Sequence, residues 1–346
     1  MRRTATTFLL AGILVAGCAE ADPSPTPAGA ITPSTFASEP TPASAAGTTA
    51  SAAASSGDAV EWERLADAPF ARLEMAVAAH DGQIFLAGGL SPLGDALTDV
   101  EIFDPATGTW TEGPSLPTGI HHAALVSDEQ RLLLIGGYLG SAFNRPSELV
   151  LELSPGSESW AEGPALPQAR AAGAAAWDGS RIVYAGGVGA DGVAADVDAL
   201  ENGTWSRLGS MVQTREHLAA TSDGAGTVWL LGGRVGSLDT NLADVELVSG
   251  SAISSLGRLP TARGGVAAFH DPARGACLTG GEAPTFAITN VECIDADGAV
   301  VTLPELNEPH HGHGAAVLDG VAYVILGGPE PTLSAGSTIE SLALGG

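Results

Sequence analysis

Four short apolar segments, bounded by turn residues, recur in the same order along most of the chain. In the first copy they are residues 75–79, 83–87, 100–103 and 109–113, and the dipeptide Asp81-Gly82 joins the first two. Short apolar runs between clusters of Gly, Pro and Asp are typical of β-strands, and Asp-Gly between two such runs predicts a hairpin. The pattern therefore predicts a repeated unit of four strands.

The second segment of every unit ends in a double glycine. The six pairs end at Gly89, Gly137, Gly187, Gly233, Gly281 and Gly328, so the steps are 48, 50, 46, 48 and 47 residues. A period in this range indicates one supersecondary unit per repeat. The first strand of each unit contains an Ala-Ala pair, which suits strands crowded around an axis. Residues 59–346 are therefore predicted to form an all-β, six-bladed β-propeller.

The two ends of the repeated region predict how the propeller closes. The last unit has strands near residues 314–318, 321–326 and 339–342, and Gly346 follows without room for a fourth strand. Residues 60–65, around Trp62, form a lone fourth strand at the other end. We expect this N-terminal strand to complete the last blade, because closure removes the unpaired sheet edges that invite aggregation.

These units resemble kelch repeats, which have a double glycine after the second strand and a tryptophan some twenty residues later. The fourth-strand tryptophans are Trp62, Trp110, Trp160 and Trp205, and Ile253 takes the same place in another unit. Kelch repeats often have a tyrosine in the third strand, where this chain has Phe103, Leu153, Val248 or Ile294. These residues replace a polar group by an apolar core contact, so the expected fold is unchanged.

The N-terminal region predicts export and membrane attachment. Arg2 and Arg3 precede a short apolar run, residues 8–15, which is too short to span a bilayer and indicates a secretory signal. Residues 15–18 resemble a bacterial lipobox, which implies removal of residues 1–17 and lipidation of Cys18. Ordinary signal cleavage, with Cys18 incidental, is the alternative. We expect a protein attached by its lipid alone to a bacterial membrane, at the cell surface or in the periplasm.

Residues 18–58 differ in composition from everything that follows. They are rich in Pro, Ser, Thr and Ala and show no apolar periodicity. Such a segment cannot bury enough apolar surface to offset the entropy of ordering, so it is predicted to be a disordered tether.

The charge of the chain excludes some partners. The formal net charge is −26, and all 14 basic residues are arginine. The chain has no basic stripe that could neutralise phosphates, so the charge argues against binding to nucleic acid and against adsorption to an anionic membrane surface. The expected partner is a protein or carbohydrate.

Ten residues after the fourth-strand position, the chain enters the next unit, and four units have an arginine there. These residues are Arg72, Arg170, Arg215 and Arg263. The kelch resemblance implies that they lie around the channel mouth, where such domains commonly bind partners. Guanidinium groups suit acidic proteins, peptides and sugar acids. Alternatively, each arginine pairs with a carboxylate of the chain itself, for which the candidates are Glu101, Asp198, Glu246 and Glu292.

Histidines occupy the same stretch in the two remaining units. Ile120 has the arginine position in the second unit, and the register of the sixth unit is ambiguous. The histidines added to the predicted ligand-binding residues are His121, His122, His310 and His313. Imidazoles suit zinc or copper, but a turn sequence fixes no ligand geometry. The prediction is therefore that no metal and no other cofactor is bound.

Cys277 and Cys293 are the two cysteines of the predicted propeller. They lie on the second and third strands of the fifth unit, at equal distances from the middle of the connecting loop. Export favours oxidation, so a cross-strand disulfide is one interpretation, and two buried thiols are the other.

The sequence contains no complete catalytic constellation. A copper-radical oxidase of the galactose oxidase type also has a kelch propeller, but it needs a tyrosine beside a ligand histidine, and none of Tyr138, Tyr184 and Tyr323 neighbours a histidine. No Gly-x-Ser-x-Gly motif of a hydrolase is present either. The leading hypothesis is an anchored binding protein. The alternative, from the resemblance to exported six-bladed kelch propellers, is a sugar-acid mutarotase of the sialic acid type.

Overall fold

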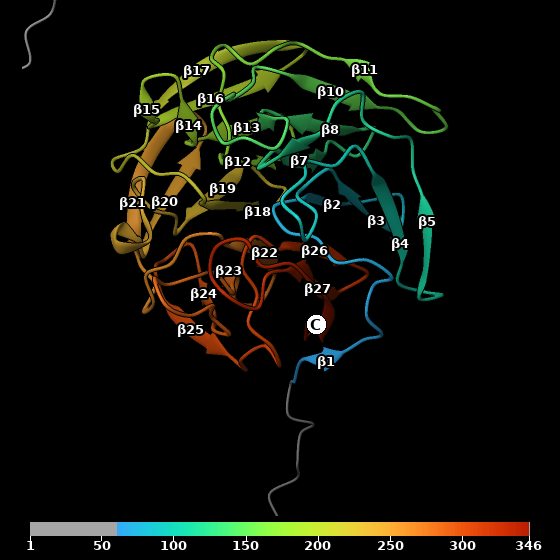
Figure 1. Cartoon of the computed structure of the whole chain (residues 1–346). Coiled ribbons are helices and arrows are strands. Elements are labelled where there is room, and N and C mark those ends of the chain that lie inside the picture. The colour runs from blue at the N-terminus through green and yellow to red at the C-terminus, as the bar shows by residue number, and fades with distance from the viewer. Residues whose placement is uncertain (1–60, 346) are drawn as a thin grey trace, which may run out of the picture. The chain divides into compact units, whose positions relative to one another are not determined.

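Six antiparallel sheets of four strands surround a central axis in the computed structural model, which describes residues 61–345 (Figure 1). Blade 1 consists of β2 (Ala76–His80), β3 (Gln83–Ala87), β4 (Val100–Asp104) and β5 (Thr109–Glu112). Blade 2 consists of β7 (Ala124–Ser127), β8 (Leu132–Ile135), β10 (Val150–Leu153) and β11 (Ala161–Glu162). Blade 3 consists of β12 (Ala174–Trp177), β13 (Ile182–Ala185), β16 (Asp196–Glu201) and β17 (Thr204–Ser210).

The remaining three blades follow the same order. Blade 4 consists of β18 (Ala219–Ser222), β19 (Thr227–Leu231), β20 (Asp244–Ser249) and β21 (Ala252–Arg258). Blade 5 consists of β22 (Ala267–Asp271), β23 (Gly275–Thr279), β24 (Val291–Ile294) and β25 (Val300–Leu303). Blade 6 consists of β26 (Gly314–Leu318), β27 (Val321–Gly327), β28 (Gly336–Ala343) and β1 (Glu63–Arg64). The predicted six-bladed propeller is confirmed.

The N-terminal strand closes the propeller as expected. Strand β1 pairs antiparallel with β28, with Glu63 opposite Ser341 and Arg64 opposite Glu340. The neighbouring Trp62 is buried, and its indole Nε1 donates a hydrogen bond of 3.1 Å to the carbonyl of Pro304 in the adjacent blade. Trp160 and Trp205 make the same bond, to the carbonyls of Pro114 and Pro164. The repeated tryptophan therefore ties each of these fourth strands to the preceding blade.

Apolar side chains fill the spaces between neighbouring blades. Six clusters of buried residues occur, one at each junction, and the cluster between blades 5 and 6 contains Trp62 and Phe269. The third-strand residues that stand where kelch repeats often have tyrosine are all buried. They are Phe103, Leu153, Val248 and Ile294. Ile253 lies opposite Val248, as Trp110 lies opposite Phe103, which confirms its place in the repeat.

The double glycines are required where one blade meets the next. Gly88 and Gly89 have φ of 62° and 93°, in the left-handed region that glycine tolerates. A Cβ atom at Gly88 would lie 2.4 Å from the carbonyl oxygen of Ile120. The glycines thus permit both the turn after the second strand and the close approach of the neighbouring backbone.

The fifth blade contains a covalent cross-link. Cys277 on β23 lies directly opposite Cys293 on β24, and the structure joins their sulfur atoms in a disulfide. The sequence left open a disulfide or two buried thiols, and the structure shows the disulfide.

Two short strand pairs and one 3-10 helix of residues 61–345 lie outside the blades. They are the pair β6 (Ile120–His121) and β9 (Tyr138–Leu139), the pair β14 (Val188–Gly189) and β15 (Gly192–Val193), and the 3-10 helix η1 (Leu238–Thr240). No helix within residues 61–345 is long and apolar enough to cross a membrane. The predicted signal at 1–17, the lipidation of Cys18 and the tether at 18–58 fall outside the described residues.

Candidate binding site at the channel mouth

The four predicted arginines are buried inside the blades. Their side chains are 3% or less exposed, and each pairs with a carboxylate on the third strand of its own blade. Arg72 contacts Glu101 at 2.6 Å and Arg263 contacts Glu292 at 3.4 Å, while Arg170 and Arg215 contact Asp198 and Glu246. The internal-pairing interpretation of the sequence therefore describes the structure.

This geometry corrects the prediction that Arg72, Arg170, Arg215 and Arg263 bind a ligand. The guanidinium of Arg215 also donates to the carbonyls of Gly232 and Asp244, so it links three segments of blade 4. Burial lowers the pKa of Arg263 to about 10, which leaves the group charged at neutral pH. Each of these arginines links the loop that enters its blade to the third strand of the same blade.

Two residues beyond the arginine position, the backbone forms a closed ring around the axis. Its members, which we call the axial ring, are Glu74, His122, Ala172, His217, Gly265 and Gly312. Each donates its N–H to the carbonyl of the ring member in the preceding blade, over 2.7–3.0 Å, and Glu74 donates to Gly312. All six have φ between 52° and 65°. The hydrogen bonds thus impose the left-handed conformation on non-glycine residues, at a cost of about 1–2 kcal/mol each.

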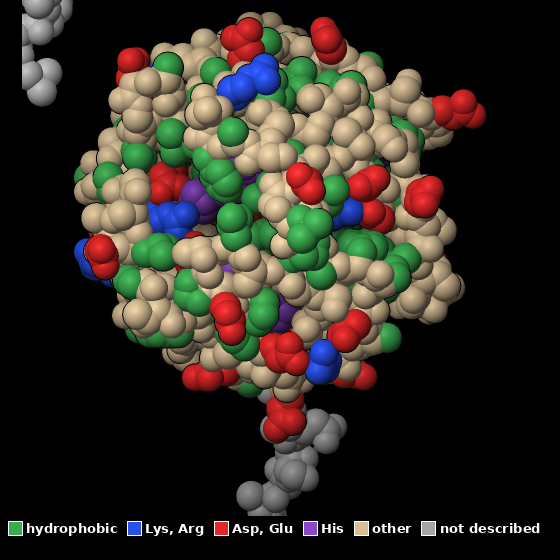
Figure 2. Space-filling model, viewed as in Figure 1, with side chains coloured by type: hydrophobic (Ala, Val, Ile, Leu, Met, Phe, Trp, Pro, Cys, Tyr) green, Lys and Arg blue, Asp and Glu red, His purple; other side chains and the backbone are tan. Residues whose placement is uncertain are grey.

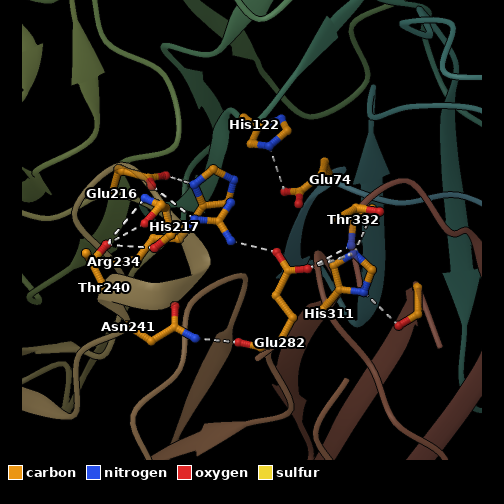
Figure 3. A network of polar contacts seen from close by, with 12 residues as sticks. Glu74, His122, Glu216, His217, Arg234, Thr240, Asn241, Glu282, His311 and Thr332 are labelled. Carbon is orange, nitrogen blue, oxygen red and sulfur yellow. Dashed lines mark hydrogen bonds and ion pairs between the residues drawn. The ribbon is translucent and has the colours of Figure 1, made fainter. Parts of the chain in front are cut away.

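Three members of the axial ring place polar side chains together at one end of the channel. The Nε2 atom of His122 lies 3.4 Å from Oε2 of Glu74, and the rings of His122 and His217 are 4.8 Å apart and nearly perpendicular. One donor atom from each of Glu74, His122 and His217 lies within 4.8 Å of the others. Figure 3 shows them on different blades, turned toward a common centre.

A second row of polar residues surrounds this group. Arg234 donates from Nε to Glu216 at 3.0 Å and from Nη1 to Glu282 at 2.6 Å. The other oxygen of Glu216 lies against Nδ1 of His217, and Oε2 of Glu282 is 3.8 Å from Nε2 of His311 (Figure 3). The guanidinium of Arg234 is therefore held between two carboxylates.

Burial controls protonation at the mouth. It lowers the pKa of His122 to about 3 and that of His121 to about 4, and it lowers the pKa of His217 well below 6.5, with further lowering by Arg234. Burial also raises the pKa of Glu74. At neutral pH these three imidazoles are uncharged and keep a free electron pair.

A cavity of about 500 Å³ opens above these groups, and we call it the mouth cavity. Its polar wall includes Glu74, His122, Glu216, His217, Arg234 and Glu282, and its apolar wall includes Tyr138, Phe143, Leu238 and Leu333. Figure 2 shows histidine side chains in the hollowed centre of this face, beside basic and acidic ones. Below it, between the alanine-rich first strands, the channel contains a smaller cavity of about 150 Å³.

The predicted histidines divide between the mouth cavity and the core. His122 lines the cavity, and His121 is buried behind it, with its ring 5.3 Å from that of Tyr138. His310 pairs with Glu340 at 3.3 Å, which gives it the arginine position of blade 6 and resolves the ambiguous register. His313 contacts Thr279 at 2.8 Å inside the channel. His310 and His313 are thus internally bonded, and their prediction as ligand-binding residues at the mouth is corrected.

The sequence interpretation missed most of the polar wall. Glu74 and His217 stand two positions after Arg72 and Arg215, and Glu216, Arg234 and Glu282 were not singled out. Aligning the six repeats by their double glycines and then comparing the positions after the arginine would have found Glu74 and His217 with His122.

Comparisons with known proteins agree with this architecture. The kelch motif matches residues 71–117, which include all of blade 1. Beta-scruin of Limulus polyphemus is 32% identical over 80 residues, which are 23% of this chain and 9% of that protein. Alpha-scruin of the same organism is 30% identical over 86 residues, 25% of this chain and 9% of the relative. An F-box/kelch-repeat protein of Arabidopsis thaliana is 42% identical over 50 residues, 14% of this chain and 13% of the relative.

These matches are local, since they span about a tenth of the length of the relatives. The six repeats, the closed propeller and the motif match together define a kelch-type β-propeller. The motif match and the local similarity to kelch-repeat proteins support assignment of the chain to the kelch-repeat family.

Proposed function

We propose that this chain is an exported, lipid-anchored binding protein that holds a protein partner at the channel mouth. The observation that carries the proposal is a set of exposed apolar side chains in loops, two of which, Phe143 and Leu333, line the polar mouth cavity. Leu93, Phe143, Phe286 and Leu333 are 88%, 50%, 59% and 61% exposed, and all four lie in loops that follow second strands. Exposed apolar groups gathered on one face mark protein interaction sites, and aromatic residues are enriched in them.

The charge of the cavity changes the expected ligand. The polar wall contains three carboxylates, Glu74, Glu216 and Glu282, against one guanidinium, Arg234, and its histidines are neutral. The arginines that suggested an acidic ligand are buried in ion pairs. We therefore propose that the part of the partner entering the mouth cavity is neutral or cationic, for example a lysine side chain or an amide.

The mutarotase alternative gains no support from this geometry. A sugar carboxylate needs a free guanidinium, whereas Arg234 already binds Glu216 and Glu282. Measuring the exchange of sialic acid anomers by NMR, with and without the protein, tests this alternative directly, and we expect equal rates.

Export and anchoring rest on the sequence of residues 1–58. In a bacterial host, the wild-type chain should incorporate a labelled fatty acid and sediment with membranes. Cys18→Ala should abolish the label and release the chain from the membrane. A Cys18→Ala chain that still carries lipid, or a wild-type chain that is never labelled, would contradict the anchor.

Photo-crosslinking tests the binding face. A photoreactive amino acid at Leu333 would lie on the rim of the mouth cavity, whereas one at Asp81, in the turn between β2 and β3, lies at the opposite end of the channel. In cells that naturally contain the chain, we expect a discrete adduct from position 333 and none from position 81. Adducts formed only from position 81 would place the partner on the wrong face for this proposal.

A further inference from the structure

The group formed by Glu74, His122 and His217 has the composition of a metal site. It offers two imidazole nitrogens and one carboxylate oxygen, all within 4.8 Å of one another, from three different blades. Two histidines and one carboxylate with open positions on the remaining side bind zinc in hydrolases and iron(II) in oxygenases. We propose that this triad binds one divalent transition-metal ion at the axis of the propeller, with its open coordination positions facing the mouth cavity.

The spacing of the donors is close to what an ion needs. A tetrahedral zinc ion with bonds of about 2.0–2.1 Å has donors about 3.3 Å apart. His122 Nε2 and Glu74 Oε2 are already 3.4 Å apart. The third donor has to approach by up to about 1.5 Å from the 4.8 Å limit, and rotation of the His217 side chain can supply this while the axial ring holds its backbone.

Both histidines have a contact at Nδ1, which leaves Nε2 for the proposed ion. Nδ1 of His217 lies against the carboxylate of Glu216, and Nδ1 of His122 lies against Nδ1 of His121. Metal-binding histidines almost always have a carboxylate, carbonyl or other acceptor on the second ring nitrogen, which fixes the ring. In this arrangement Nε2 of each ring is directed to the metal, and Glu216 is the supporting carboxylate.

The electrostatics of the site suit a dication. Three carboxyl groups, those of Glu74, Glu216 and Glu282, lie at the triad or beside it, against one guanidinium, that of Arg234. The positive charge of Arg234 is shared between Glu216 and Glu282.

The conformation of the backbone is a further observation. The axial ring requires φ near 55°, and two of its six members are glycine. Glu74, His122 and His217 occupy left-handed positions, where non-glycine residues are uncommon. Residues held in such conformations cluster at functional sites, which agrees with a site formed by these three side chains.

This inference departs from the sequence prediction that no metal is bound, and it does not rest on the proposed protein partner. The test uses the full-length mature protein, purified in detergent without a polyhistidine tag and stripped with a chelator. Equilibrium dialysis against Zn²⁺, followed by elemental analysis, should give one ion per chain with a dissociation constant at or below the micromolar range.

Matched variants assign the ion to the triad. Ala172 shows that the axial ring accepts alanine, so His122→Ala and His217→Ala should fold, and circular dichroism will check this. We expect each to weaken Zn²⁺ binding by at least 100-fold, and Glu74→Gln by at least 10-fold. The control is His270→Ala on β22, which lines the cavity at the opposite end of the channel and should bind as wild type does.

A measurement on the wild type keeps the proposal falsifiable even if the variants misfold. X-ray absorption at the zinc edge should show two imidazole ligands and only nitrogen or oxygen in the first shell. A stripped wild-type chain that binds no Zn²⁺, Mn²⁺ or Fe²⁺ below 100 micromolar would overturn the proposal. So would binding that survives both His122→Ala and His217→Ala.

Discussion

The backbone N–H of Glu74 donates a hydrogen bond of 2.7 Å to the carbonyl of Gly312, and this bond joins the first blade to the last. It completes the axial ring, in which every blade contributes one donor and one acceptor. At the circumference, β1 completes blade 6 by pairing with β28. The propeller is therefore closed at two places, by the axial ring at its centre and by the β1–β28 pair at its circumference. The axial ring also carries polar side chains of the mouth cavity.

Trp62→Ala tests the outer closure. Trp62 is buried, stacks edge-on against Phe269 and donates to the carbonyl of Pro304. Removing the indole should lower the free energy of unfolding by about 3–5 kcal/mol. Urea unfolding followed by circular dichroism measures this, and Glu61→Ala, at an exposed neighbouring position, is the control with little expected change. A Trp62→Ala chain as stable as the control would contradict the closure.

Arg170→Met tests the role of the buried arginines. The substitution leaves the buried carboxylate of Asp198 without its partner and should lower the free energy of unfolding by about 3–5 kcal/mol. The double variant Arg170→Met/Asp198→Asn should be more stable than the single variant, because the uncompensated charge is gone. Arg207→Ala, at a side chain 52% exposed, should change stability by less than about 1 kcal/mol. Equal losses at positions 170 and 207 would show that burial of the pair is irrelevant.

Gly88→Ala and Gly82→Ala form a matched pair in blade 1. Both glycines have positive φ, but a Cβ at Gly88 would lie 2.4 Å from the Ile120 carbonyl, whereas a Cβ at Gly82 would have no atom within 4 Å. We expect Gly82→Ala to cost about 1 kcal/mol from backbone conformation alone. Gly88→Ala should cost clearly more, and thermal unfolding of the two variants compares them. Similar thermal unfolding midpoints for the two variants would contradict the role of the double glycine in the close approach of neighbouring blades.

Acid should destabilise the fold because its buried histidines are held neutral. His313 allows the effect of one such histidine to be tested. Burial, with smaller effects of His310, His311 and Arg263, lowers its pKa well below 6.5. Below about pH 6.5 the unfolded chain therefore binds a proton that the folded chain does not. The free energy of unfolding should then fall by up to about 1.4 kcal/mol per pH unit for each such histidine, until the folded group titrates.

Urea unfolding between pH 7.5 and 5 measures this dependence. His313→Gln can keep the hydrogen bond to Thr279 but does not titrate, so its stability should fall less steeply with acid than that of the wild type. Parallel profiles for the two chains would mean that His313 is not held neutral in the folded state.

The fold could be predicted because its determinants are local and repeated. The double glycines, the Asp81-Gly82 turn and the fourth-strand tryptophans each specify a turn or a contact that every blade needs. The carboxylate partners of Arg72, Arg170, Arg215 and Arg263 were also identified as one of two alternatives. The sequence could not decide whether these arginines pair internally or bind a ligand, because spacing along the chain does not tell how deeply a side chain is buried.

The site itself was less accessible to sequence reasoning. His122 was included, but its neighbours Glu74 and His217 come from blades 1 and 4, and only the closed ring brings them together. Arg234 and Glu282 follow double glycines, which in the sequence pattern mark only the end of the second strand. A set of residues contributed by several blades becomes visible only when the repeats are aligned around the axis.

Partner affinity of rim variants tests the central claim, that the channel mouth is the functional face. Once crosslinking from position 333 has identified the partner, its dissociation constant can be measured by calorimetry for Phe143→Ala and Leu333→Ala. The controls are Val300→Ala and Val301→Ala, which shorten exposed apolar side chains on β25, 39% and 45% exposed. We predict at least tenfold weaker binding for the two rim variants, about 1.4 kcal/mol each, and less than twofold for the controls. Rim variants that bind as wild type does, with weakened β25 variants, would contradict the account.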